Sequence, residues 1–381
     1  MLLLANKPKL NAIGFRTIIL LSGFILSLMT NIQASPLKSD EEVIFFSTIG
    51  YPAANGVTWE LHIHGWVYEP QWDINIFIQK NTWLNLEVYQ GEETTNSIFK
   101  QRAGAFFVDN EGGKQIAIRM GHKHFTLNKS GGNGHFFDLL RLPAADIDNL
   151  RKPGNTNDFI PFETANQASD SRPFKGEIQL IDGEGLSIIS DIDDTIKISE
   201  VNRKASLLAN TFVRPFQAVP KMANRYQTWA KQGNVTFHYV SASPWQLYQP
   251  LADFLADKGF PMGSFHLRLF RWKDGTFFDF FKSSRQHKIE TIQSLIACCR
   301  QRYFILVGDS GEQDPEIYAS IARQYPQRIA HIFIRDVTEE DENAKRYQKT
   351  FNGLPESLWT LFRETTTLET DLSQFLPKPE E

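Results

Sequence analysis

A chain of 381 residues is long enough for two ordinary domains, and 41% hydrophobic with 22% charged residues is typical of a globular protein. This composition excludes disordered and fibrous proteins. The formal net charge of -4 provides no basic field of the kind that neutralises nucleic-acid phosphates, so nucleic acid is not expected as a partner.

The N-terminal segment 1–34 has the layout of a signal peptide, because Lys7 and Arg16 precede an uncharged apolar stretch at 18–29. That stretch is about 12 residues long, whereas a permanent membrane span needs ~20. Positive charge before the stretch predicts that the rest of the chain lies outside the cytoplasm, in the periplasm or secreted. The leader is then either removed or kept as an uncleaved membrane anchor.

Residues 35–165 predict a β-rich domain. Val57, Trp59, Leu61 and Ile63 alternate with polar residues, which is the pattern of a half-buried strand. Gly-rich breaks recur and helical spacing is rare, so we expect a β-sandwich-like domain.

Histidines and cysteines have a metal or redox interpretation beside a structural one. Two histidine pairs could each place two imidazoles on one strand face, namely His62 with His64 and His122 with His124. Alternating polar positions normally face water, and we favour that interpretation over a metal site. Cys298 and Cys299 are neighbours in a helix-like segment, where no ordinary disulfide forms between them, so we favour two small apolar side chains in a core helix.

A segment rich in Ser, Asp, Asn and Pro predicts a linker at 166–175, and a different pattern follows it. Helices are expected to begin at Ser243, as an N-cap before Pro244, and at Asp314, before Pro315. Between helices, short apolar runs predict buried strands at 186–190, 235–240, 264–270, 303–307 and 329–334. This alternation predicts an α/β catalytic domain over 176–350, with a parallel sheet between helices, followed by a helical tail at 351–381.

Three of these strands end in reactive side chains. The first runs into Asp191, Asp193 and Thr195, the second into Ser241, and the fourth into Asp309. In a parallel sheet the carboxyl ends of the strands meet at one edge, where ligands bind. Lys288, at the start of a later helical segment, could complete the cluster.

This set of residues suits hydrolysis of a phosphate ester through a covalent intermediate. Asp191 would attack phosphorus, and Asp193 would act as acid and base, which requires a raised pKa. Mg²⁺ held by Asp191, Asp309 and the Asp193 carbonyl would separate the carboxylate from the phosphate. The remaining phosphoryl oxygens would be held by Lys288 and Ser241, and the Asp loop would be oriented by Thr195.

Three assignments stay open. Asp314 is either the N-cap of its helix or a member of the Mg²⁺ shell. Arg214, in the short segment between the first two strands, either grips a phosphoryl oxygen or faces solvent. An aromatic and basic segment either dips into a membrane or fills a core, and we slightly favour the core; its residues are Trp272, Lys273, Phe277, Phe278, Phe280, Phe281, Lys282 and Arg285.

Three motifs carry a family resemblance: SDIDDTIK at 190–197, HYVSASPWQLY at 238–248 and VGDSGEQDPE at 307–316. Together with Lys288 they resemble the four motifs of the haloacid dehalogenase superfamily, and they look like the actin-patch family of phosphatidate phosphatases, whose motifs lipins share. The resemblance implies Mg²⁺-dependent conversion of phosphatidate to diacylglycerol and phosphate on a haloacid-dehalogenase-like fold with a minimal cap. It also implies Asp191 as nucleophile, Asp193 as acid and base, and Asp309 as metal ligand.

We therefore expect a phosphatidate phosphatase that meets its phospholipid at a membrane surface. The predicted leader departs from the cytosolic family members, so their endocytic partners are not transferred and no protein partner is identified. Two alternatives are a phosphatase for a soluble or protein-bound phosphomonoester, and a non-catalytic lipid-binding or adhesion protein. The intact set of Asp191, Asp193, Lys288 and Asp309 argues against the second.

Overall fold

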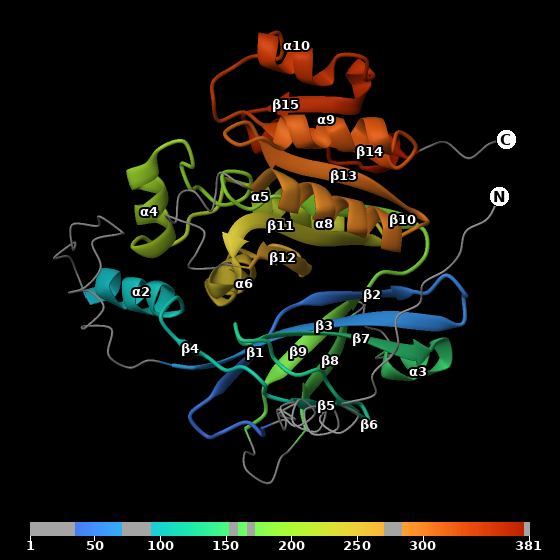
Figure 1. The fold of residues 1–381 in the computed structure, drawn as a ribbon. Coiled ribbons are helices and arrows are strands. Elements are labelled where there is room, and N and C mark those ends of the chain that lie inside the picture. Colours follow the sequence, from blue (N-terminus) through green and yellow to red (C-terminus); the bar gives the residue numbers. More distant parts are fainter. Residues whose placement is uncertain (1–34, 71–92, 152–158, 166–171, 270–283, 377–381) are drawn as a thin grey trace, which may run out of the picture.

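The computed structural model describes residues 35–70, 93–151, 159–165, 172–269 and 284–376. The predicted leader at 1–34 and most of the aromatic segment, at 270–283, lie outside these residues. The described chain forms two β-sheets, one from each half of the sequence, with α8 and the second sheet lying over β2 and β3 of the first (Figure 1).

The first sheet has nine strands that are mostly antiparallel, and only β2 and β9 pair in parallel. The strands are β1 (Glu42–Phe45), β2 (Thr48–Pro52), β3 (Thr58–Glu69), β4 (Asp109–Asn110), β5 (Ala117–Met120), β6 (Lys123–Thr126), β7 (His135–Pro143), β8 (Phe159–Thr164) and β9 (Lys175–Leu180). β1 and β2 pair along one edge of β3, and β7 pairs along the other. All nine strands are connected in one sheet, so the predicted β-sandwich is not confirmed.

The long strand β3 confirms the predicted alternation for Trp59, Leu61 and Ile63, which are buried, but Val57 precedes the strand and is 64% exposed. The expectation that its histidines face water is wrong for His64, which is only 6% exposed. The reason is that His64 lies on the face of the first sheet that packs against the second half of the chain. At this contact Phe46 packs on Trp245, with ring centroids 4.2 Å apart.

The second sheet has six parallel strands in the order β12-β11-β10-β13-β14-β15. They are β10 (Gly185–Ser190), β11 (Val235–Pro244), β12 (Ser264–Arg268), β13 (Arg302–Asp309), β14 (Ile329–Arg335) and β15 (Trp359–Phe362). The first five confirm the strands predicted from short apolar runs. β15 lies within the predicted helical tail, and it joins the sheet because Trp359 to Phe362 pair in parallel with β14.

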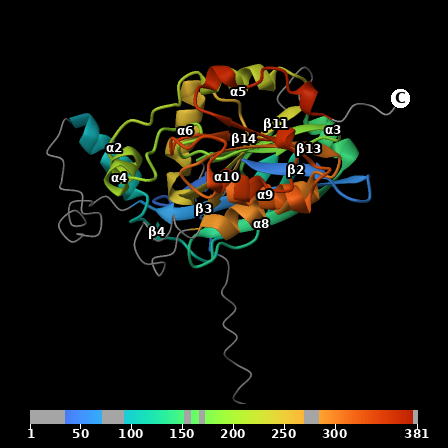
Figure 2. The ribbon, with the colours of Figure 1, turned by 90° about the horizontal axis from the view of Figure 1, so that it is seen from above.

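Helices cover both faces of the second sheet, as predicted (Figures 1 and 2). One face packs on α5 (Met222–Ala230) and α6 (Tyr248–Lys258), and the other on α8 (Ser284–Cys298), α9 (Asp314–Gln324) and α10 (Lys345–Phe351). The remaining α-helices of the described residues are α2 (Glu93–Gly104), α3 (Ala144–Leu150) and α4 (Lys204–Phe212).

The start of α6 differs from the prediction. β11 continues through Ser243 to Pro244, and α6 begins only at Tyr248, so Ser243 is not a helix N-cap. Its hydroxyl is used elsewhere, as described below. The helix ends at Lys258, where Gly259 caps it with a left-handed φ of 75°.

The change from the first sheet to the second falls between Leu180 and Gly185, after the linker predicted at 166–175. β9 therefore belongs to the first sheet. The strand ends that carry the predicted chemistry all belong to the second sheet, at its carboxyl edge.

Candidate active site

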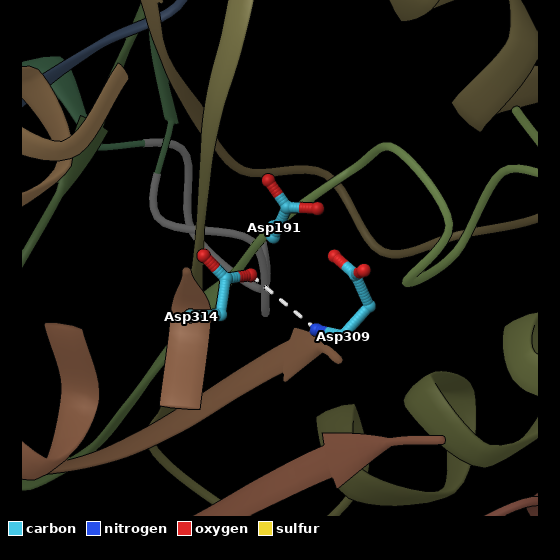
Figure 3. A group of neighbouring side chains, drawn as sticks. All are labelled: Asp191, Asp309 and Asp314. Carbon is cyan, nitrogen blue, oxygen red and sulfur yellow. Dashed lines mark hydrogen bonds between the residues drawn. The ribbon is translucent and has the colours of Figure 1, made fainter. Parts of the chain in front are cut away.

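Three buried carboxylates meet where β10 and β13 end. Asp191 directly follows β10, Asp309 is the last residue of β13, and Asp314 is the first residue of α9. The two strands pair in register, and the Asp191 N–H donates to the Val307 carbonyl at 2.9 Å. One carboxylate oxygen from each aspartate lies within 4.8 Å of the others (Figure 3).

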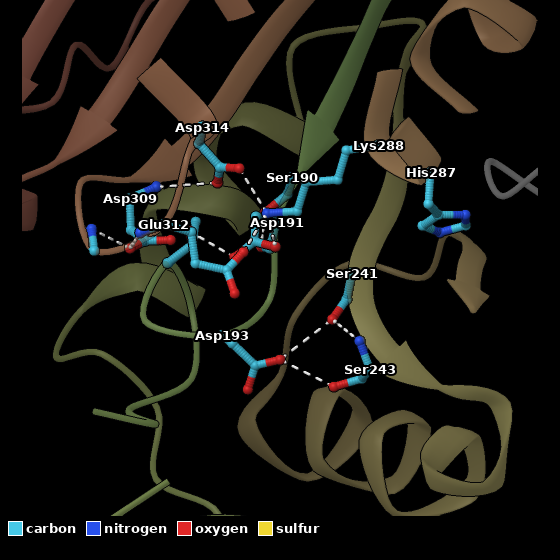
Figure 4. A network of polar contacts seen from close by, with 12 residues as sticks. Ser190, Asp191, Asp193, Ser241, Ser243, His287, Lys288, Asp309, Glu312 and Asp314 are labelled. Carbon is cyan, nitrogen blue, oxygen red and sulfur yellow. Dashed lines mark hydrogen bonds and ion pairs between the residues drawn. The ribbon is translucent and has the colours of Figure 1, made fainter. Parts of the chain in front are cut away.

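Lys288 provides a buried ammonium group beside these carboxylates. Its Nζ lies 2.9 Å from Asp191 Oδ1, 2.6 Å from Asp314 Oδ1 and 3.0 Å from Glu312 Oε2 (Figure 4). Burial lowers the pKa of Lys288, but attraction to Asp191, Asp314 and Glu312 outweighs burial and raises the pKa well above its ordinary value. The lysine is therefore charged, and it pairs with the predicted nucleophile.

Asp309 has one carboxylate oxygen that is satisfied and one that is not. Oδ1 accepts the Gly311 N–H at 2.6 Å and the Glu312 N–H at 3.2 Å. Oδ2 is buried and has no hydrogen-bond partner. Burial, and then the nearby charges of Asp314 and Asp191, raise the pKa of Asp309 well above its ordinary range.

An unpaired buried carboxylate oxygen is costly unless a cation binds it. Asp191 shows the same tendency, because burial raises its pKa further than Lys288 lowers it. The acceptors gathered here are carboxylate oxygens, which suit a hard divalent cation such as Mg²⁺. Asp191, Asp309 and Asp314 therefore fit the cation that the motifs imply.

Asp314 is placed in this cluster and is not a helix N-cap. α9 has Gln313 at its N-cap position and no side-chain cap. The carboxylate of Asp314 instead accepts from Lys288 and, at 3.3 Å, from the Asp309 backbone N–H. Of the two interpretations drawn from the sequence, the structure supports a place beside the predicted metal ligands.

Asp193 lies apart from the other carboxylates and has partners of its own. Its Oδ1 lies 2.7 Å from Lys197 Nζ and accepts the Ser199 hydroxyl at 2.7 Å. Its Oδ2 accepts the hydroxyls of Ser241 at 3.2 Å and Ser243 at 3.0 Å (Figure 4). The predicted site thus divides into a cluster around Lys288 and a second around Asp193.

The pKa of Asp193 is lowered, which corrects the expectation that its surroundings raise it. Burial raises the pKa, but the charge of Lys197 and the hydrogen bonds from Lys197, Ser199 and Ser243 outweigh burial. No role was expected for Lys197, Ser199 or Glu312, and Ser243 was expected only as a helix N-cap. Lys197, Ser243 and Glu312 stand within the quoted motifs, which was the available signal, whereas Ser199 lies just beyond one.

The loop after β10 is shaped by two side chains. Thr195 Oγ1 donates to Asp191 Oδ2 at 3.1 Å, as its expected orienting role requires. Asp194 has a left-handed φ of 56°, and its carboxylate accepts three backbone N–H groups at 2.7–2.8 Å, those of Ser199, Glu200 and Val201. This loop turns Asp193 away from Asp191 and toward Lys197.

Arg214 is the one predicted site residue that the structure does not bring to either cluster. It is exposed, and its guanidinium donates to Asn210 Oδ1 at 3.2 Å. Its backbone carbonyl accepts from Arg102 of α2 at 2.8 Å. Of the two interpretations drawn from the sequence, the structure supports the solvent-facing one.

Comparison with known proteins finds a family model and two relatives that are similar to the segment carrying the site. Residues 186–336 match the model of the family described as "Phosphatidate phosphatase APP1, catalytic domain". The chain is 36% identical over 169 residues to phosphatidate phosphatase APP1 of Saccharomyces cerevisiae, covering 42% of this chain and 28% of that protein. It is 34% identical over 211 residues to an uncharacterised protein of Schizosaccharomyces pombe, covering 54% of this chain and 34% of that protein. The matches span only 34% and 28% of the lengths of these relatives.

The predicted extracytoplasmic location is corrected by these comparisons. The similarity to phosphatidate phosphatase APP1 of Saccharomyces cerevisiae contradicts the expectation of a secreted or periplasmic chain. Within the described ranges, no helix is long and apolar enough to cross a bilayer. The segment 1–34, on which the expectation rested, lies outside them.

The match to the family covers both clusters of the site. Asp191, Asp193, Lys288, Asp309 and Asp314 all fall within 186–336, whereas the first sheet precedes this segment. Residues 186–336 are therefore similar to the catalytic domain of phosphatidate phosphatase APP1.

Proposed function

We propose that this chain is a Mg²⁺-dependent phosphatidate phosphatase that releases diacylglycerol and phosphate through an aspartyl-phosphate intermediate. The observation that carries the proposal is the position of Asp191, at the end of a central strand, 2.9 Å from a charged lysine and beside Asp309 and Asp314. The match of residues 186–336 to the APP1 catalytic domain supports the same activity.

In this proposal the Asp191 carboxylate attacks phosphorus and becomes the aspartyl phosphate. Lys288 and Thr195 contact two different oxygens of that carboxylate, so they fix its orientation, and Lys288 also attracts the phosphoryl group. The Ser241 hydroxyl lies between β11 and Asp193, where it can donate to a phosphoryl oxygen instead.

Asp193 donates a proton to the leaving oxygen and later takes one from the attacking water. In the structure it is held in its ionised form by Lys197, so it must first gain a proton. A phosphomonoester dianion beside Asp193 would raise its pKa by repulsion, so binding of the substrate itself favours the protonated acid.

Mg²⁺ is assigned to Asp191, Asp309 and Asp314 in this proposal, with the Asp193 carbonyl as a further ligand. When bound, the ion neutralises the charge of the carboxylates and of the phosphate, which would otherwise repel each other. The unpartnered Oδ2 of Asp309 supports this assignment. We also propose that the second sheet is haloacid-dehalogenase-like with a minimal cap, because α4 and α5 are the only helices between the Asp loop and β11.

Phosphate release from a panel of substrates tests the proposal. The panel contains phosphatidate in vesicles, p-nitrophenyl phosphate and a phosphopeptide, each with Mg²⁺ and with EDTA, for the wild type and for Asp191→Asn. We expect release from phosphatidate that needs both Mg²⁺ and Asp191. Release from the phosphopeptide alone would favour a protein phosphatase, and no release from any substrate would favour a non-catalytic protein.

A further inference from the structure

A cavity of about 590 Å³ lies between the two sheets, next to the candidate active site. Its floor comes from β2 and β3 of the first sheet, and its other walls come from β12 and α8 (Figure 1). It is separate from the carboxylate cluster, and nothing in the proposed reaction uses its side chains.

The cavity runs along one face of α8 and begins beside the catalytic lysine. His287, Thr291, Ser294 and Cys298 line it at a spacing of three or four residues, so they share one face of the helix. From His287 to Cys298 the helix rises about 16 Å. His287 is the residue before Lys288, and its side chain points away from the Asp191 cluster (Figure 4). The cavity is therefore elongated, with one end near the site.

The opposite wall also leads to the site. Trp245 lines the cavity and follows Ser243, whose hydroxyl bonds to Asp193, by two residues. Leu267 and Leu269 line it at the carboxyl end of β12, which is the edge of the sheet where the catalytic residues stand. Both walls thus carry residues that lie within a few positions of the site residues in the sequence or at the same edge of the sheet.

The exposed surface of the lining is mainly apolar, although Asp138, Arg268 and Glu290 also line the cavity, and burial lowers the pKa of its histidines. Ile63, Phe265 and Leu295 form part of the wall. Burial lowers the pKa of His266 to about 3 and that of His287 to about 4. An elongated site without charged imidazoles suits a hydrocarbon chain better than an anion.

Phe137 supplies an independent indication of an apolar ligand. It lines the cavity, yet it is 52% exposed, one of the large hydrophobic side chains of the described residues that water reaches freely. Its ring stacks on His64 at 4.0 Å between centroids and does not reach the core. A hydrocarbon ligand in the cavity would cover this ring.

We propose that this cavity binds one acyl chain of the lipid substrate while its phosphate lies at Asp191. The inference rests on the proposed function, because it names the place of the chain in that same substrate. It predicts that the enzyme distinguishes phosphatidates by acyl length even when they are monomeric in water, since each methylene that enters the cavity contributes about fourfold to binding.

The test compares dibutyryl and dioctanoyl phosphatidate, both as monomers, with p-nitrophenyl phosphate as a substrate that has no acyl chain. Thr291→Trp/Ser294→Trp fills the cavity from α8, and Phe137→Ser removes the ring at its mouth. Ala297→Trp is the matched control, because Ala297 is an exposed residue of α8 outside the lining. Binding of dansyl-undecanoic acid, followed by its fluorescence, gives a readout that needs no turnover.

We expect the wild type and Ala297→Trp to have a kcat/KM at least about tenfold higher for dioctanoyl than for dibutyryl phosphatidate. The preference should fall below about threefold in Thr291→Trp/Ser294→Trp and fall partially in Phe137→Ser, with p-nitrophenyl phosphate turned over as in the wild type. Dansyl-undecanoic acid should bind the wild type and not the filled variant. If Thr291→Trp/Ser294→Trp misfolds, the length preference of Phe137→Ser and the binding of dansyl-undecanoic acid to the wild type still test the acyl site.

Equal kcat/KM for the two phosphatidates in the wild type, or a length preference and dansyl binding that survive the filling, would overturn the acyl site and leave the proposed function standing. If the wild type turns over p-nitrophenyl phosphate but hydrolyses neither phosphatidate, the lipid substrate is overturned instead. The two failures are therefore distinguished within one experiment.

Discussion

Replacing Asp309 by asparagine should stabilise the metal-free protein. Asp309 Oδ2 is buried without a hydrogen-bond partner, and its neighbours Asp191 and Asp314 are also carboxylates. An amide has the same shape, carries no charge, and can donate a hydrogen bond to either neighbour. In the absence of a cation, Asp309→Asn therefore removes the repulsion with Asp191 and Asp314 and gives the buried side chain a hydrogen-bond partner.

The size of the effect follows from the cost of the unmet bond. A buried polar group without a partner costs about 1–3 kcal/mol, so we expect the free energy of unfolding in EDTA to rise by that amount. For a unit of this size the melting temperature changes by about 2–4 °C per kcal/mol, so Tm should rise by several degrees. Saturating Mg²⁺, at a hundred times its Kd, should stabilise the wild type by about 2.7 kcal/mol.

The variant lacks one ligand and should gain much less from Mg²⁺, so its advantage over the wild type should shrink by up to about 2.7 kcal/mol when the ion is added. The pKa of Asp309 is raised in the folded state. The stability that its protonated carboxyl gives the wild type is therefore present below the unfolded pKa of about 4 and is lost as pH rises through the folded pKa. The advantage of Asp309→Asn in EDTA should therefore be larger at pH 7 than at pH 4.

Thermal unfolding of the wild type and variant in EDTA and in MgCl₂ measures both effects. The matched control is Asp336→Asn, because Asp336 is also buried at the end of a neighbouring strand but is paired, 2.6 Å from Arg363 Nε. That variant should lose stability under both conditions. A lower Tm for Asp309→Asn in EDTA, or an equal gain from Mg²⁺ in the variant and wild type, would refute the reasoning.

Three further predictions concern residues around the site and in the core. Asp191→Asn should retain less than about a thousandth of wild-type kcat, and Thr195→Val about a tenth, in steady-state phosphate release; equal kcat in both variants would contradict the assigned roles. Lys197→Met should move the pH profile of kcat/KM to higher pH, because Asp193 loses the charge that lowers its pKa; an unmoved profile would remove Asp193 as the acid. His331 is buried and neutral, with a pKa of about 4. The wild type therefore loses stability as pH falls from about 6.5 toward 4. His331→Phe keeps the packing on Phe375 and should shift acid unfolding, followed by fluorescence, to lower pH.

Much of the site could be predicted because it depends on strand ends. Short apolar runs bounded by helical segments located β10, β11 and β13, and the carboxyl-edge rule then placed Asp191 near Asp309. The contacts of Asp193 could not be predicted in the same way. They depend on the left-handed turn at Asp194, which directs Asp193 to Lys197, and no pattern of apolar residues encodes that turn.

The first sheet shows a second limit of sequence patterns. Alternation in β3 correctly identified the residues that share a face, such as Leu61 and Ile63. It could not tell which layer covers the opposite face, where His64 lies, nor that β9 pairs in parallel with β2 to connect nine strands into one sheet. His64 was misjudged for the same reason, because its burial depends on packing against Trp245 from the other half of the chain.

The two aspartates of the Asp loop have pKa values shifted in opposite directions, and each shift opposes the proposed role. Burial, together with the charges of Asp314 and Glu312, raises the pKa of Asp191, although a nucleophile must be ionised. Lys197 and three hydroxyls hold Asp193 ionised, although an acid must carry a proton. A cation bound at Asp191 favours its ionised form, and a phosphomonoester dianion bound near Asp193 favours its protonated form. The site thus reaches its reactive protonation state only with both bound, so chelation should abolish turnover without weakening the Lys197–Asp193 pair.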